Sequence, residues 1–193
     1  MKEIVLIGGG GHCKACIDVI ELESKYKIAG ILDLKEKIGQ KILNYPIIGT
    51  DDDIIDLAHR GITFIISIGQ ILSAVRRTEL YLFLEQNQIK LPVIVSPLSH
   101  VSESAKIGEG TIIMHHALIN ADVVIGSNCI INSKALIEHD AKIGDHCHIA
   151  TGAIINGGVE VGNSTFFGSG AVSVQNARIP ENSFIKANSL FIM

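Results

Sequence analysis

The chain has 193 residues, a formal net charge of −4 at pH 7, 47% hydrophobic residues and 5% aromatic residues. A chain of this length can bury the core of one large or two small domains, and its hydrophobic content excludes a disordered protein. The acidic balance argues against a nucleic-acid partner, because such a surface needs clustered lysine and arginine side chains.

The chain begins with a short apolar run, residues 4–7. Four apolar residues are too few for the core of a signal peptide or for a membrane span. We therefore expect a cytoplasmic protein with no membrane partner. The four cysteines fit reduced thiols in that compartment better than a disulfide framework: Cys13, Cys16, Cys129 and Cys147.

The first half of the chain alternates strand patterns with helical patterns. Buried strands are predicted at residues 4–7, 28–32, 47–48 and 64–68, and helices at residues 13–22 and 73–87. Thr50 is a predicted helix cap, followed by three aspartates that favour the positive end of the helix dipole. Strands that alternate with helices predict a Rossmann-like parallel sheet, which we place at residues 1–96, with a linker around Pro92 and Pro97.

The second half of the chain repeats every six residues. Steps of six from Val101 to Phe191 meet sixteen positions, of which all but Ser173 are apolar, and the series that starts at Ala105 holds only small residues. One large and one small inward residue per six fit a short strand followed by a tight corner, stacked in coils. Glycines recur eighteen residues apart, which indicates three sides per coil: Gly108, Gly126, Gly144 and Gly162. We predict a triangular parallel β-helix over residues 97–193.

This repeat resembles that of the hexapeptide-repeat acyltransferases, whose coil is a left-handed β-helix. The segment Ile-Gly-Gly-Gly-Gly-His at residues 7–12, Asp33 after the second strand, and Gly69 after a later one are similar to the sialic-acid O-acetyltransferase-like (NeuD-type) family. That family includes the PglD-type UDP-4-amino-sugar N-acetyltransferases of bacterial glycan synthesis. The segment at residues 132–140 is similar to the active-site coil of the family. The resemblance implies an acetyl-CoA-dependent enzyme that forms homotrimers, with acetyl-CoA between neighbouring prisms.

His139 is the predicted general base. It follows the inward Ile137 by two residues but falls at neither inward position of the six-residue repeat, so its side chain is expected to point outward from the corner. Asp140 could orient the imidazole and raise its basicity, as a general base needs. Spacing alone also fits a solvated surface histidine; the resemblance implies the catalytic role.

The resemblance implies a further set of residues that contact acetyl-CoA. His148 matches a histidine that contacts the thioester region, and Asn132 would help the same site. Ser169 and Ala187 would bring their backbone to the pantetheine arm. The last coil carries Lys-Ala-Asn at residues 186–188, where such enzymes usually have glycines. That departure keeps open a non-catalytic trimeric scaffold that binds a nucleotide sugar.

The glycine run is the predicted nucleotide-sugar site. Gly8, Gly10 and Cys13 occupy the places of a G-x-G-x-x-G motif, so the third glycine is missing. A glycine-rich turn before a helix still presents backbone N–H groups to a phosphate, although a tight turn without a ligand also fits. The resemblance implies that the nucleotide sugar is held by Gly10, Gly11, His12, Asp33 and Gly69.

The predicted reaction is acetyl transfer to the amine of a UDP-linked 4-amino-4,6-dideoxy sugar. O-acetylation of a sialic-acid-type sugar is the close alternative. No metal is expected, because Cys129 and Cys147 occupy small inward positions of the repeat, where buried thiols explain them. Three isoleucines are expected to face neighbouring prisms of the trimer: Ile112, Ile130 and Ile154.

Overall fold

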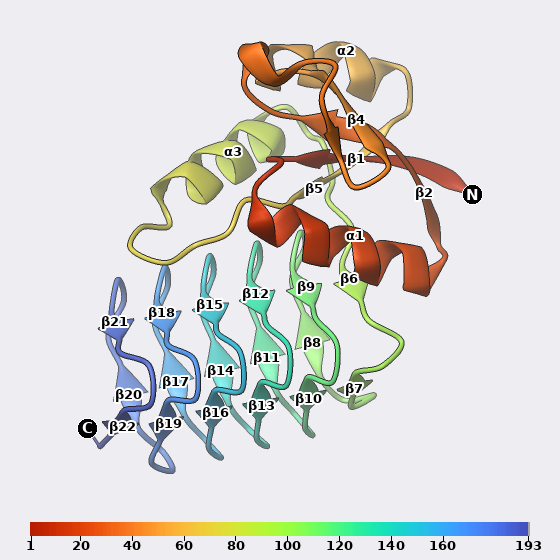
Figure 1. Ribbon diagram of the computed structural model, residues 1–193. Helices are drawn as coiled ribbons and strands as arrows, with labels where there is room; N and C mark the ends of the chain where they lie inside the picture. The colour runs from red at the N-terminus through yellow and green to blue at the C-terminus, as the bar shows by residue number, and fades with distance from the viewer. Residues whose placement is uncertain (193) are drawn as a thin grey trace.

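The computed structural model describes residues 1–192 and consists of an α/β domain seated on one side of a parallel β-helix (Figure 1). The predicted fold class is confirmed. Within the described residues, none of the helices combines the length and apolar character that a membrane crossing requires. The main elements of the α/β domain are β1 (Lys2–Ile7), α1 (Gly11–Glu23), β2 (Tyr26–Leu32), β3 (Lys41–Ile42), β4 (Tyr45–Gly49), α2 (Ile54–His59), β5 (Thr63–Ile66) and α3 (Val75–Gln86).

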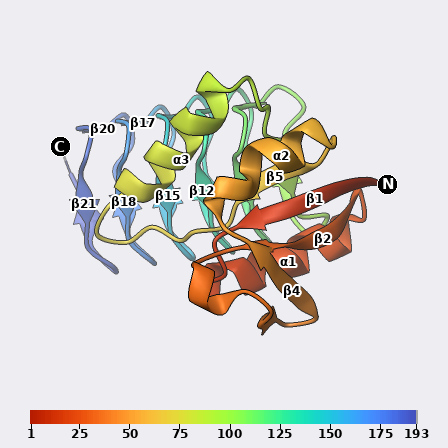
Figure 2. The ribbon, with the colours of Figure 1, turned by 90° about the horizontal axis from the view of Figure 1, so that it is seen from above.

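The sheet of the α/β domain has the order β3-β4-β2-β1-β5. The pairs β1–β2, β1–β5 and β2–β4 are parallel, as the alternation of strands and helices predicts, whereas β3 and β4 form an antiparallel hairpin. Ile4 and Leu6 of β1 pack with α1, while Val5 and Ile7 pack with α2 and α3 on the other face. Figure 2 shows α1 on one side of the sheet and α2 with α3 on the other.

Thr50 caps a helical segment, as predicted. Its side chain accepts a hydrogen bond from the Asp52 N–H at 3.3 Å, and the Asp53 carboxylate accepts one from the Thr50 N–H at 2.8 Å. This reciprocal capping box begins with a 3-10 turn, Asp51–Asp53, that continues directly into α2.

The β-helix consists of three sheets whose strands pair with partners eighteen residues away. The covered sheet contains β6 (Ile94–Val95), β9 (Ile112–Ile113), β12 (Ile130–Ile131), β15 (His148–Ile149), β18 (Phe166–Phe167) and β21 (Phe184–Ile185). The apolar sheet contains β7 (His100–Val101), β10 (Leu118–Ile119), β13 (Leu136–Ile137), β16 (Ile154–Ile155), β19 (Val172–Ser173) and β22 (Leu190–Phe191). The charged sheet contains β8 (Lys106–Ile107), β11 (Val124–Ile125), β14 (Lys142–Ile143), β17 (Glu160–Val161) and β20 (Arg178–Ile179).

The interior of the prism follows the predicted six-residue register. The large inward residues from 113 to 179 are buried, and so are the small inward residues from 111 to 177. Ser173, the polar exception, is also fully buried and lies within hydrogen-bonding distance of the Asn156 N–H, at 3.0 Å. Cys129 and Cys147 lie inside the prism, where each thiol donates to a glycine carbonyl, at 3.1 and 3.2 Å.

The covered sheet is where the α/β domain sits. Ile112 and Ile130 are fully buried in one cluster with Ile17 and Ile20 of α1. The expectation that Ile112 and Ile130 face neighbouring prisms is therefore wrong, because the α/β domain covers them. Ile154, the third of that set, lies on the apolar sheet.

The stretch predicted as a linker already contains structure. Ile94 of β6 pairs with Ile112, so the first strand of the β-helix lies between the two prolines. His115, in the corner after β9, bridges the two parts of the chain. One of its ring nitrogens is 2.6 Å from the Ser96 hydroxyl, and the other is 2.7 Å from the Asp18 carboxylate of α1. The exact domain boundary stays a prediction.

Candidate functional site

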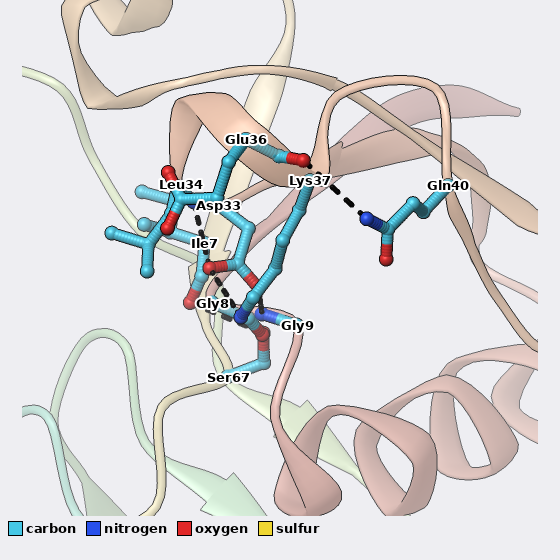
Figure 3. A network of polar contacts seen from close by, with 9 residues as sticks. All are labelled: Ile7, Gly8, Gly9, Asp33, Leu34, Glu36, Lys37, Gln40 and Ser67. Atoms are coloured by element: carbon cyan, nitrogen blue, oxygen red, sulfur yellow. Dashed lines mark hydrogen bonds and ion pairs between the residues drawn. The ribbon is translucent and has the colours of Figure 1, made fainter.

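The glycine run forms a cradle where β1 ends and α1 begins (Figure 3). Gly8 has a φ of +102°, which favours glycine, and its N–H donates to the Leu32 carbonyl at 2.8 Å. The buried Ser67 hydroxyl lies 2.7 Å from the Gly8 carbonyl, a contact that the sequence did not predict. A side chain at Gly8 would collide with Ile68, so the loop after β5 packs directly against the cradle.

Asp33 closes one side of this cradle. Its carboxylate accepts hydrogen bonds from the Gly9 N–H at 3.0 Å and the Leu34 N–H at 2.7 Å, and it pairs with the Lys37 ammonium at 3.0 Å. Burial alone would raise the pKa of Asp33, but the Leu34 N–H, Lys37 and the Gly9 N–H together lower it, so the carboxylate is charged at neutral pH. Asp33 also lines a cavity of about 280 Å³ at the carboxyl ends of β1 and β2.

The other predicted nucleotide residues lie around the same strand ends. A Cβ atom at Gly10 or Gly11 would meet no atom within 4 Å, so the start of α1 is open to a ligand. His12 packs against Gly69, and burial together with the Arg77 charge lowers the pKa of His12 to about 3. His12 is therefore neutral. The structure thus brings all five predicted substrate residues to one edge of the sheet, where parallel α/β sheets bind ligands.

Arg76 forms the rim of the cavity beside Asp33. Its guanidinium pairs with the Asp51 carboxylate and lies 3.6 Å from the Glu79 carboxylate. Its place on the cavity wall, next to Asp51, puts a cation within the candidate site.

His139 lies at the corner between the apolar and charged sheets, with 55% of its side chain exposed. Its Nδ1 is 2.8 Å from the Asp140 carboxylate, which can only accept a hydrogen bond, so the neutral ring carries its proton on Nδ1. The Asp140 hydrogen bond raises the pKa of His139. The Nε2 atom has no hydrogen-bond partner among the described residues, and the catalytic role of His139 stays a prediction.

Gly157 is a further residue of this corner. It stands eighteen residues after His139, one coil along, and a Cβ atom at Gly157 would lie 2.9 Å from the Cε1 and Nε2 atoms of the imidazole. The imidazole therefore lies directly against Gly157, and a side chain there would require the His139 ring to move. The spacing of eighteen is the one signal in the sequence that could have pointed to Gly157.

The predicted acetyl-CoA residues lie mainly at another corner, between the covered and apolar sheets. Asn132 follows β12, Ser169 follows β18 and Ala187 follows β21, so they line one edge of the prism. Ser169 and Ala187 are exposed and lie in adjacent coils, which the Asn188 N–H links by donating to the Ser169 carbonyl at 2.8 Å.

His148 is buried beneath the α/β domain, with 7% of the residue exposed. Its Nδ1 is 2.5 Å from the Gln70 carbonyl and its Nε2 is 3.1 Å from the Asn132 amide nitrogen. A carbonyl accepts and an amide N–H donates, so the ring is neutral with its proton on Nδ1. Burial lowers the pKa of His148 to about 4, which agrees with a neutral ring. Its predicted contact with the thioester stays a prediction.

The two halves of the candidate site are not together within one chain. The α/β domain, with its glycine cradle, covers one side of the triangular prism (Figure 1). His139 follows β13 at the corner between the other two sheets. The prism itself stands between them. As for metals, the described residues contain no group of three or more histidine, cysteine, aspartate or glutamate side chains that could hold an ion.

The His139–Asp140 pair predicts a measurable titration. Asp140→Asn removes the carboxylate that favours the imidazolium, so the pKa of His139 should fall toward its ordinary value. An NMR titration of the histidine ring protons measures this. Asp122→Asn, at the equivalent exposed position one coil earlier on the same edge, is the matched control. An unchanged His139 titration in Asp140→Asn would show that the two side chains do not interact in solution.

Two family models match the chain: the PglD N-terminal domain over residues 3–81, and the bacterial transferase hexapeptide (six repeats) over residues 104–139. The UDP-N-acetylbacillosamine N-acetyltransferase of Bacillus subtilis (strain 168) is 33% identical over 116 residues, which make up 59% of this chain and 52% of that protein. The chain thus spans about half the length of that relative.

Solved structures resemble almost the whole chain. The acetyltransferase domain of PglB from Neisseria gonorrhoeae FA1090 has a TM-score of 0.91 and 26% identity, over 98% of this chain and 91% of that one. PerB from Caulobacter crescentus, in complex with CoA and GDP-perosamine, has a TM-score of 0.90 and 29% identity, over 98% of this chain and 88% of that one. The chain thus joins a PglD-type N-terminal domain to a transferase hexapeptide repeat, and along nearly its whole length it resembles PglD-like hexapeptide-repeat acetyltransferases.

Proposed function

We propose that the protein transfers the acetyl group of acetyl-CoA to the amine of a nucleotide-linked amino sugar, with a UDP-linked 4-amino-4,6-dideoxy sugar as the favoured acceptor. The observation that carries this proposal is the exposed His139, whose Nε2 is free while Asp140 holds Nδ1. One relative is named as a UDP-N-acetylbacillosamine N-acetyltransferase, and another was solved in complex with CoA and GDP-perosamine. Both support a nucleotide-linked amino sugar as the acceptor.

The proposed chemistry uses His139 as base and then as acid. The sugar amine attacks the thioester carbonyl and its proton passes to Nε2 of His139, while the Asp140 carboxylate stabilises the imidazolium. Collapse of the tetrahedral intermediate breaks the carbon–sulfur bond. The imidazolium then returns the proton to the leaving thiolate, which gives CoA and the acetylated amine.

The outward residues of the three sheets support a homotrimer. The covered sheet is occupied by the α/β domain, and the charged sheet presents Lys106, Lys142, Glu160 and Arg178 to solvent. The apolar sheet presents a stripe of aliphatic side chains that no helix or sheet of residues 1–192 covers: Leu118, Leu136, Ile154, Val172 and Leu190. A solvent-exposed aliphatic stripe of this kind marks an interface, and a closed ring of three copies would bury it.

This assembly would also complete the site. Both edges of the apolar sheet carry predicted site residues: His139 on one edge, and Asn132, Ser169 and Ala187 on the other. When three prisms turn their apolar sheets inward, the first edge of one chain meets the second edge of its neighbour. Acetyl-CoA would then lie between two chains, with His139 of one chain facing the cradle and the His148–Asn132 pair of the next.

The glycine cradle would hold the nucleotide sugar. The open start of α1 at Gly10 and Gly11 suits the diphosphate, because helix N-termini present free N–H groups to anions. Asp33 and Gly69 would line the nucleoside side, and His12 would approach the sugar from beneath. We place the protein in the cytoplasm, in keeping with its four free cysteines.

The direct test is acetyl transfer in solution. The protein is incubated with acetyl-CoA and a panel of UDP- and GDP-linked amino sugars and sialic acids, and free thiol is followed over time. A hydroxyl acceptor would use the same base, so the panel decides between amine and hydroxyl. We expect turnover with an amino-sugar nucleotide, and a loss of about 10²–10⁴-fold in His139→Ala.

His59→Ala, at the exposed end of α2, is the control and should keep the wild-type rate. Absence of thiol release with every acceptor would overturn the proposal and favour the non-catalytic scaffold. If the rate of His139→Ala stays within tenfold of wild type, the proposed reaction would stand, but His139 would not be its general base.

The apolar sheet predicts a second, separate result. Leu118→Lys places a charge in the proposed interface and should dissociate the trimer, whereas Val124→Lys on the charged sheet should not. The two positions are matched, since 38% of Leu118 and 41% of Val124 are exposed in the single chain. Light scattering after size exclusion measures the mass of each. An unaltered mass for Leu118→Lys would rule out this face as the interface.

A further inference from the structure

Arg77 is a buried cation that pairs with no carboxylate among the described residues. It is the third residue of α3, only 1% of it is exposed, and all its partners are neutral acceptors. One terminal nitrogen donates to the carbonyls of Ile66 and Ile68, at 3.2 and 2.7 Å. The other donates to the carbonyl and side-chain oxygens of Asn128, at 2.9 and 2.8 Å.

These four hydrogen bonds join the two parts of the chain. Ile66 and Ile68 belong to the end of β5 and the loop after it, whereas Asn128 is a buried corner of the β-helix with a φ of +53°. The Asn128 amide returns the contact by donating to the Arg77 carbonyl at 3.2 Å. A guanidinium suits this role because its planar fork directs several donors at once.

The loop that Arg77 fixes reaches both ligand regions. Ile68 packs against Gly8 in the cradle, and Gly69 packs against His12. The next residue, Gln70, uses its backbone carbonyl to accept the Nδ1 proton of His148. On the other side, Asn128 precedes β12, whose Ile130 pairs with His148 of β15. The Arg77 side chain therefore holds both the loop after β5 and the coil that contains Asn128. His148 contacts both of these segments.

The position of this loop determines the state of His148. As long as the Gln70 carbonyl is in place, the His148 proton stays on Nδ1 and its Nε2 accepts from the Asn132 amide. The Asn132 side chain is then oriented toward His148, and its oxygen accepts from the Ser133 N–H at 2.8 Å. If the loop shifted, the ring would lose its acceptor and the proton would distribute over both nitrogens.

We propose that Arg77 is a positioning residue, which anchors the loop after β5 to the β-helix. It thereby sets the tautomer of His148 and the orientation of Asn132, on the prism edge where acetyl-CoA is proposed to bind. The catalytic part of this inference rests on the proposed acetyl transfer, whereas the tautomer part does not. Burial of a cation without a counter-charge is costly, and simple packing would be served equally by an apolar side chain. Burial lowers the pKa of Arg77 to about 10, so the guanidinium remains charged at neutral pH.

The test combines three variants with two readouts. Arg77→Met removes the donors, Arg77→Lys keeps the charge without the fork, and Asn128→Gly removes one acceptor at a corner whose left-handed backbone suits glycine. Arg178→Met, on the exposed charged sheet, is the matched control. Nitrogen-15 spectra of histidine-labelled protein report the His148 tautomer, with His148→Gln identifying its signals. Thiol release reports the rate, and the melting temperature reports folding.

We expect wild-type protein and Arg178→Met to show His148 protonated on Nδ1, and the three test variants to show both tautomers. Acetyl transfer should fall on the order of 10²-fold in Arg77→Met, because small displacements of positioned groups cost that much. If Arg77→Met fails to fold, Arg77→Lys and Asn128→Gly carry the test. A wild-type His148 protonated on Nε2, or folded variants with an unchanged tautomer and rate, would overturn the proposal. Absence of turnover in the wild type would refute the proposed reaction and leave the tautomer result standing.

Discussion

The stacking of coils at intervals of eighteen residues is the constraint on which the rest of the molecule depends. Backbone hydrogen bonds join each coil to the next, as from the Ile130 N–H to the Cys147 carbonyl at 2.9 Å, so no coil can shift by one residue without turning its core outward. Fixed register assigns every side chain to the interior, to one of three faces or to a corner. It thereby brings His139 over Gly157 and aligns Ser169 with Ala187.

Each face of the prism then has a distinct use. One is covered by the α/β domain, one is charged, and the third is aliphatic and flanked by the two edges that carry the candidate site. This arrangement explains why a single chain holds the cradle and His139 on opposite sides of the prism. The proposed trimer reconciles them, because packing of the aliphatic faces brings the two kinds of edge together. Assembly and catalysis would then depend on the same residues.

The sequence predicted what depends on local periodicity, and it failed where contacts are distant in the chain. The buried series through Ile137, the inward cysteines and the outward His139 all follow from a period of six. The burial of Ile112 and His148 does not, because the α/β domain that covers them docks through contacts such as Arg77–Asn128 and His115–Asp18, which join residues 51 and 97 positions apart. The β3–β4 hairpin was missed because its strands are short and lack a regular alternation of apolar residues.

The central claim is that each site is built from two chains, and mixed trimers test it most directly. Gly11→Glu blocks the cradle at a helix start where no atom lies within 4 Å of the new Cβ, and His139→Ala removes the base. Each variant alone should be inactive. Trimers assembled from equal amounts of the two should recover about a quarter of the wild-type rate, since an intact cradle then meets an intact His139 of its neighbour by chance. Mixed trimers that remain as inactive as either parent would contradict the account.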